Sequence, residues 1–153
     1  MSNHIINFKR FHENASMPLR GTDWSAGYDL HAVTCDIDWD KGLVTYGTGI
    51  GMEIPAGYVG LVFPRSSVFK KEMTLSNCVG VIDSDYRGEI KVVFRIPKNY
   101  FYFQDPHLAN KIYVTGDRIC QIVIVPYLPV DWVETEELST TVRGTGGFGS
   151  TGV

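Results

Sequence analysis

The polar run at residues 77–89 carries the carboxylate best placed for general-base chemistry. It reads NCVGVIDSDYRGE, with apolar residues on both sides of Ser84–Asp85. This pattern predicts a β-hairpin that turns at Ser84–Asp85 and places Asp83 at the end of Val81–Ile82. A carboxylate held at the rim of a pocket can accept a proton from water. Taken by itself, however, the run favours the simpler interpretation that Asp83 only caps a turn.

A second stretch has residue types that bind phosphate. Pro64–Ser67 (PRSS) follows an apolar run and leads into residues 66–73, where we predict a short helix with Ser66 or Ser67 as its N-cap. The free N–H groups at a helix start, together with Arg65 and the serine hydroxyls, can bind an anion. The alternative is a simple N-cap turn, and these four residues alone favour that alternative.

The end of the chain, residues 143–153, reads RGTGGFGSTGV. Gly144–Gly149 has the GxGxxG spacing, but a dinucleotide site needs a strand before this motif and a βαβ unit around it. Such a glycine-rich segment is either a disordered tail or a flap that orders on a ligand. In a flap, glycine N–H groups would wrap a phosphate, Arg143 would add a charged fork and Phe148 would stack on a base. Both interpretations stay open at this point.

Two shorter stretches place polar residues near predicted strand ends. AGYDL at 26–30 contains Asp29, which could face a metal, and GDRICQ at 116–121 contains Gln121, which could hold a water. Asp117 and Arg118 fit a structural ion pair as well as a catalytic role. Neither the histidines nor the three cysteines have metal-ligand spacing, and we expect the cysteines to be buried, reduced thiols.

The elements that position these residues are predicted to be short strands. Glycine and proline recur at short intervals, and between them lie runs rich in β-branched and aromatic residues, such as 58–63, 90–96 and 119–125. This spacing predicts one all-β domain, a sandwich, jelly roll or barrel. Residues 92–94 and 119–125 are nearly continuous apolar runs, as in strands buried on both faces. Because a partner subunit often supplies the second cover in a small β protein, we expect a homo-oligomer.

The composition argues against two classes of partner. The formal net charge is −3, whereas direct nucleic-acid binding or binding to an anionic membrane favours a basic surface. No stretch approaches the roughly 20 apolar residues of a membrane span, and the N-terminus lacks the apolar region of a signal peptide. An anionic ligand must therefore be bound by a few placed cations, backbone N–H groups or a metal.

Five stretches in this order resemble the motifs of the trimeric dUTP diphosphatase (dUTPase) family. They are AGYDL at 26–30, PRSS at 64–67, GVIDSDYRGEI at 80–90, GDRICQ at 116–121 and RGTGGFGSTG at 143–152. Each is short, but their joint order and spacing are specific. The resemblance implies an all-β, jelly-roll-like β-barrel or sandwich with one short helix, assembled as a homotrimer. Residues 1–138 would form the β domain, and residues 139–153 a flexible glycine-rich flap belonging to it.

The resemblance also implies which residues bind the nucleoside. Asp83 would be the general base that activates the attacking water. Asn77 would contact uracil, and Tyr86 would pack against the deoxyribose. The backbone that recognises the base would come from Gly80, Val81 and Ile82.

The remaining roles implied by the resemblance concern the triphosphate. Its phosphates would be bound by Arg65, Ser66 and Ser67. Gln121 would position a water, and Asp29 would reach a Mg²⁺ cofactor through water only. Each of three active sites would take residues from all three subunits. A neighbouring subunit's flap would close the site with Arg143, Phe148, Gly149 and Ser150.

The implied reaction is hydrolysis of dUTP to dUMP and pyrophosphate by attack of water on the α-phosphorus. This reaction would keep uracil out of DNA and supply dUMP for dTMP synthesis. We expect a cytoplasmic enzyme, in the host cytoplasm if the chain is viral, with a nuclear location possible in a eukaryote. The alternatives are a dCTP deaminase-like enzyme and a binding protein gated by the nucleotide.

The segment at residues 97–115 is longer than the corresponding connection in compact members of the family. It reads PKNYFYFQDPHLANKIYVT. We interpret it as a longer hairpin that packs its own aromatic side chains. The alternative is a surface for a protein partner, because exposed aromatic residues are enriched at interfaces.

Overall fold

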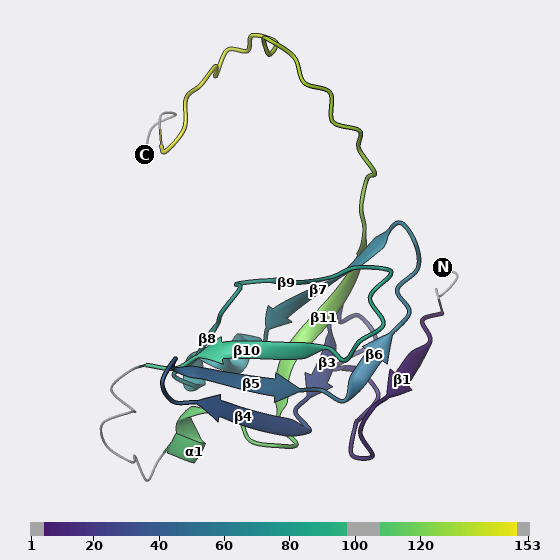
Figure 1. Cartoon of the computed structure of the whole chain (residues 1–153), viewed down its shortest axis with the longest axis vertical. Coiled ribbons are helices and arrows are strands. Elements are labelled where there is room, and N and C mark those ends of the chain that lie inside the picture. The colour runs from purple at the N-terminus through teal and green to yellow at the C-terminus, as the bar shows by residue number, and fades with distance from the viewer. Residues whose placement is uncertain (1–4, 98–107, 150–153) are drawn as a thin grey trace.

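The computed structural model describes residues 5–97 and 108–149, which form mostly short strands (Figure 1). The strands are β1 (Phe8–Arg10), β2 (Leu19–Arg20), β3 (Tyr28–His31), β4 (Thr34–Asp38), β5 (Leu43–Gly47), β6 (Ile50–Met52), β7 (Tyr58–Pro64), β8 (Thr74–Leu75), β9 (Gly80–Ile82), β10 (Lys91–Arg95) and β11 (Arg118–Pro126). The helices are the 3₁₀-helix η1 (Ser66–Lys70) and the α-helix α1 (Leu108–Lys111). None of the helices in the described ranges is long and apolar enough to cross a membrane.

The strands form two main antiparallel sheets and one small one. The strand order is β2-β3-β11-β7-β9 in the larger sheet and β4-β5-β10-β8 in the second, and β1 pairs with β6. Figure 1 shows the four-stranded sheet in front of β11 and β7. The buried core draws side chains from both sheets, including Leu30, Phe94 and Ile122. The predicted all-β, jelly-roll-like class is thus confirmed, with sheets that do not close into a barrel.

The position of β11 in the middle of the larger sheet explains why its sequence is almost continuously apolar. It pairs with β3 along one edge and with β7 along the other. Ile119, Cys120 and Ile122 are at most 1% exposed, whereas Val123–Val125 are only half-buried. The single chain therefore buries the first part of the strand and leaves its second part only partly covered. The homo-oligomer that we expect from this run stays a prediction.

The helix after β7 differs from the prediction in type and in capping. The expected helix at residues 66–73 is a 3₁₀-helix that ends at Lys70, and no side chain caps it. Arg65 occupies the N-cap position in an extended conformation, because the paired strand β7 runs directly into it. The predicted serine N-cap is therefore wrong, since Ser66 and Ser67 already lie inside the first turn. The short helix α1 was not predicted.

The predicted hairpin at Ser84–Asp85 is also wrong, and the difference matters for the site. Strand β9 pairs with β7, whereas β10 pairs with β5 and β8. The chain turns at Ser84–Asp85 but crosses from one sheet to the other. The crossing ends at Ile90, directly before β10. Two hydrogen bonds hold Ile90 in place: its N–H donates to the Ile50 carbonyl at 2.8 Å, and its carbonyl accepts the Thr48 hydroxyl at 2.8 Å.

The chain leaves the folded body after β11. Residues 127–149, which we call the C-terminal arm, extend away from the sheets (Figure 1), and all but Gly146 are exposed. The arm thus begins before residue 139, and the division into a domain at 1–138 and a flap at 139–153 stays a prediction. Of the 97–115 segment, residues 98–107 lie outside the described residues. Its last part packs on the body, since Ile112 and Tyr113 are about as buried as the core, at 5% and 4% exposure.

The cysteines are not uniformly buried. Cys35 and Cys78 are exposed and only Cys120 is buried, so the expectation of three buried thiols is wrong for two of them. Cys120 follows the burial pattern of β11. Burial raises the pKa of its thiol to about 12, and the nearby Asp29 charge adds to this rise.

This difference gives a simple test of the fold. At about pH 8, iodoacetamide should modify Cys35 and Cys78 but not Cys120, because only the thiolate is the nucleophile and Cys120 stays protonated and buried. Mass spectrometry of tryptic peptides measures each site. In urea all three cysteines should react. Rapid modification of Cys120 in the folded protein would contradict the described packing of β11.

Candidate active site

Three predicted motifs converge where β3, β11 and β7 run side by side. Asp29 on β3 pairs with Gln121 on β11, and Gln121 pairs with Phe63 on β7. The Asp29 carboxylate accepts from Arg65 Nε at 2.8 Å and from Arg118 Nη1 at 3.1 Å. Because Asp29 is only 15% exposed, the two guanidinium groups offset the cost of burying its charge. We call Asp29, Arg65, Arg118 and Gln121 the cationic cluster.

The cationic cluster settles one alternative left open by the sequence. Arg118 pairs with Asp29 rather than with Asp117. The Asp117 carboxylate instead accepts the backbone N–H of Val114 at 2.9 Å, within a turn. Asp117 therefore has a structural role, and Arg118 places a half-exposed cation beside Arg65.

Backbone geometry holds Gln121 in this cluster. Its amide Nε2 donates to the Pro64 carbonyl at 3.2 Å. On its other side lies Gly27, where an added Cβ would clash with Gln121 Oε1. A side chain there would displace the Gln121 amide, which accounts for the glycine of AGYDL. The amide is thereby fixed beside the residues expected to bind phosphate.

Two further residues expected at the phosphates lie at the start of η1. Ser66 is exposed, and Ser67 Oγ accepts from Arg65 Nη1 at 3.3 Å. Tyr113, which sequence reasoning missed, lies behind them with a buried hydroxyl. Burial raises the pKa of this phenol, and the Ser67 hydroxyl and the Arg65 charge oppose the rise.

Asp83 lies in a separate cavity at the other end of β7. This cavity has a volume of about 430 Å³ and is lined by Val81, Ile82, Asp83, Tyr86, Glu89, Ile90 and Lys91. The Tyr86 hydroxyl donates to the Glu89 carbonyl at 2.9 Å, and an added Cβ at Gly88 would clash with that hydroxyl. Tyr86 is therefore held along the wall of the cavity, close to Asp83.

A slot between β9 and β10 continues from this cavity. It has a volume of about 350 Å³ and is lined by Val62, Leu75, Ser76, Asn77, Gly80, Val81, Ile82, Lys91, Val92 and Val93. The slot lies between two strands that belong to different sheets, so peptide groups of the β9 edge that faces away from β7 have no ladder partner in the described structure. Asn77 stands at one end, where the backbone turns through Cys78 with φ +60°. All residues predicted to bind uracil thus line one space.

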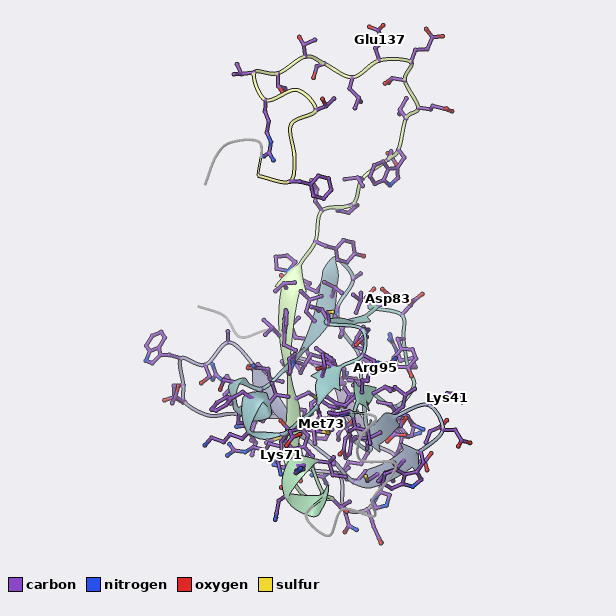
Figure 2. All side chains as sticks on the ribbon, turned by 90° about the vertical axis from the view of Figure 1, so that its left-hand side faces the viewer. Lys41, Lys71, Met73, Asp83, Arg95 and Glu137 are labelled. Atoms are coloured by element: carbon purple, nitrogen blue, oxygen red, sulfur yellow. The ribbon has the colours of Figure 1, made fainter. Side chains whose placement is uncertain are left out.

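The Asp83 cavity and the cationic cluster are far apart within one chain. Ile82 pairs with Gly60 near the start of β7, whereas Arg65 follows its end. At 3.3 Å per residue this places Asp83 and Arg65 about 20 Å apart. Figure 2 shows Asp83 at the end of the body near the arm and Lys71, which follows η1, toward the opposite end. One chain does not bring the predicted base and the predicted phosphate ligands together.

The C-terminal arm reaches neither the Asp83 cavity nor the cationic cluster. Arg143 Nε donates to the Gly146 carbonyl at 2.8 Å, and Gly144 N–H donates to the Thr141 carbonyl. Phe148 is fully exposed, and Gly149 has φ +86°. Ser150 lies outside the described residues. The roles predicted for the arm therefore stay predictions.

The residues present fit a metal ion that is coordinated mainly by water and by the phosphates of a bound ligand, and not by protein side chains. Within residues 5–97 and 108–149 no three histidine, cysteine or carboxylate side chains form a metal-binding group. A Mg²⁺ ion keeps water ligands and takes phosphate oxygens readily. Each Asp29 oxygen accepts one guanidinium N–H and retains a lone pair for a metal-bound water.

Comparison with known proteins decides the family. The dUTPase family model matches residues 13–152. The chain belongs to the dUTPase family. A relative from Hydrogenobaculum, named deoxyuridine 5'-triphosphate nucleotidohydrolase, is 42% identical over 95% of this chain and 96% of its own length. A relative of the same name from Paramecium bursaria Chlorella virus 1 is 37% identical, over 95% and 96%.

Solved structures of dUTPases have the same fold as this chain. The dUTPase of Staphylococcus bacteriophage 80alpha with dUPNHPP superimposes with a TM-score of 0.80 at 28% identity, covering 99% of this chain and 100% of that one. The dUTPase of phage phi11 of S. aureus gives 0.72 at 25% identity, covering 90% and 100%. Membership of the dUTPase family and the jelly-roll-like fold, both expected from five short motifs, are confirmed.

Proposed function

We propose that this dUTPase-family chain hydrolyses dUTP to dUMP and pyrophosphate. One observation carries the proposal: a slot between β9 and β10, two strands that are not paired with each other, adjoins a cavity that holds Asp83. The first space suits a flat base and the second suits the phosphorus next to the nucleoside. The names of the relatives and the dUTP analogue in the phage 80alpha structure support the same substrate.

The slot offers a physical basis for selecting uracil. Strands β9 and β10 face each other across it without pairing with one another, so the peptide groups on the free edge of β9 can bind the edge of a base. Cytosine presents the opposite donor and acceptor pattern to uracil and would leave buried peptide groups unsatisfied, which is strongly penalised. Gly80 leaves space in the slot beside Val62, because an added Cβ there would stand 3.1 Å from the Val62 Cβ.

The wall next to the slot suits a deoxyribose. Tyr86 is fixed through its hydroxyl to the Glu89 carbonyl, so its ring cannot move away from a sugar without breaking that bond. A ribose 2'-hydroxyl against the ring would have to displace it. We therefore propose that Tyr86 discriminates against ribonucleotides.

In the proposed reaction Asp83 orients a water and removes its proton as the water oxygen bonds to the α-phosphorus. The anhydride bond to the β-phosphate breaks, and pyrophosphate leaves with that electron pair. Arg65, the η1 N–H groups and the hydroxyls of Ser66 and Ser67 stabilise the charge on the phosphates. Mg²⁺ held by the triphosphate, and by Asp29 through water, would lower the repulsion between the phosphates and the nucleophile.

We further propose that the site is completed by other copies of the chain in a homotrimer. Asp83 and Arg65 lie too far apart on one chain to act on one triphosphate, and the exposed arm can reach a neighbour. Arg143 would then bind phosphate and Phe148 would cover the base. Ordering of the arm would exclude water from the site.

A nucleotide panel with Mg²⁺ tests the activity. The protein should release pyrophosphate from dUTP and act poorly on dCTP, dTTP and UTP. Ammonia release from dCTP, with the triphosphate intact, would instead identify a deaminase. Binding of dUTP without any hydrolysis would identify a nucleotide-gated binding protein.

Mixing two inactive variants tests the shared site. Asp83→Asn removes the base, and Arg65→Met removes a phosphate ligand while Asp29 keeps its contact with Arg118. If each site takes these residues from different chains, random co-assembly restores both to about one quarter of the sites. We expect co-refolded mixtures to recover that fraction of wild-type activity. A mixture as inactive as its components would place both residues of a site on one chain.

A further inference from the structure

Lys91 is a cation that the proposed reaction has not used. It is the first residue of β10 and lines both the slot and the Asp83 cavity. Among the residues lining these two spaces it is the only cation. Its side chain is 57% exposed and its Nζ lies 3.4 Å from Glu89 Oε2. Lys91 therefore stands at the junction between the expected places of the base and of the α-phosphorus.

Glu89 fixes the direction of Lys91. The other Glu89 oxygen, Oε1, accepts the Gly49 N–H at 2.8 Å, and the Glu89 side chain is 23% exposed. A carboxylate held in this way is a stationary partner, so the ion pair draws the ammonium group toward the cavity. Only part of the capacity of Lys91 is used, since an ammonium group has three donors.

The carboxylates that line the cavity would repel a bound phosphate unless a cation offsets their charge. Asp83 and Glu89 both line it, and both repel a phosphate. The cations of Arg65 and Arg118 lie toward the opposite end of β7 in the same chain. Lys91 is the residue of this chain's own nucleoside pocket that can offset the repulsion at the phosphate nearest the sugar.

We propose that Lys91 binds the α-phosphate of the nucleotide and so makes the pocket select a nucleotide over its nucleoside. This inference rests on the proposed function, because it requires the base in the slot and the α-phosphorus beside Asp83. It assigns a substrate-binding role to a residue outside the five motifs' predicted ligands. The same contact holds the phosphate that remains in the product dUMP.

Calorimetric titration of Lys91→Met with dUMP and with deoxyuridine tests the proposal. Loss of a charge-assisted hydrogen bond should weaken dUMP binding about 10-fold. The affinity for deoxyuridine should equal that of the unsubstituted protein. Lys91→Arg should retain most of the dUMP affinity. Arg95→Met is the matched control: Arg95 lies on the same face of β10, about 13 Å further along, and its loss should change neither affinity.

A double variant separates direct contact from screening of Glu89. In Glu89→Gln with Lys91→Met, dUMP binding should stay weak if Lys91 touches the phosphate. Recovery of affinity in the double variant, an equal loss for both ligands in Lys91→Met, or no loss at all would overturn the proposal. If the unsubstituted protein binds neither ligand and releases no pyrophosphate, the proposed function itself fails, which the Lys91 variants alone cannot cause.

Discussion

Asp83→Asn should bind dUMP as tightly as the unsubstituted enzyme and turn over dUTP about 10²- to 10⁴-fold more slowly. The amide keeps the size and position of the carboxylate but cannot take a proton from water. Because Asp83 directly follows β9 and does not line the slot, the change leaves the proposed base-binding space intact. Steady-state release of pyrophosphate measures kcat, and calorimetry with dUMP measures binding.

Asp85 provides a matched control for this experiment. It lies two residues further along the same turn, is exposed and does not line the Asp83 cavity. Asp85→Asn should therefore leave kcat unchanged within about twofold, as is usual for surface substitutions. An Asp83→Asn variant that turns over as fast as the Asp85→Asn variant would remove Asp83 from the role of base.

Deletion of residues 142–153 should reduce kcat/KM by about 10²-fold or more, because it removes the proposed phosphate ligand Arg143, the proposed cover Phe148 and the proposed closure of the site. The body should remain folded, since the described part of this segment is almost wholly exposed and packs on no core residue. Activity is measured by pyrophosphate release, and folding by circular dichroism and size-exclusion chromatography. A truncated protein with normal activity would exclude the arm from the mechanism.

Single substitutions in the arm refine this result. Phe148 and Val142 are both fully exposed, so neither substitution should alter stability. Phe148→Ala should raise KM for dUTP by losing a stacking partner, whereas Val142→Ala should not. Equal effects of the two substitutions would indicate a general requirement for the arm rather than stacking on the base.

The class of fold followed from the sequence because local patterns determine it. Short apolar runs between glycines and prolines predicted strands, and continuous apolarity at 119–125 predicted a central one. The same patterns could not tell which sheet a strand joins. Val81–Ile82 and residues 91–95 alternate like the two arms of a hairpin, yet long-range pairing with β7 on one side and β5 on the other separates them.

The candidate site was predicted from the sequence only through the order of its motifs. Taken alone, Asp83 resembled a turn cap and PRSS a simple N-cap, because four or five residues fit many structures. The pairing of Asp29 with Arg118 joins residues 89 positions apart, and no local spacing encodes it. Lys91 and Tyr113 were missed because each occupies an ordinary strand or loop position, and only burial and cavity geometry distinguish them.

The contacts of Gly27 and Gly88 show a vulnerability that functional groups alone do not reveal. Each glycine leaves just enough space for a neighbouring polar group, the amide of Gln121 or the hydroxyl of Tyr86. A single extra methyl group, added by an inherited change to alanine, would push that group out of place while every reactive atom is still present. The heritable constraint on such a pocket therefore extends to residues that do no chemistry.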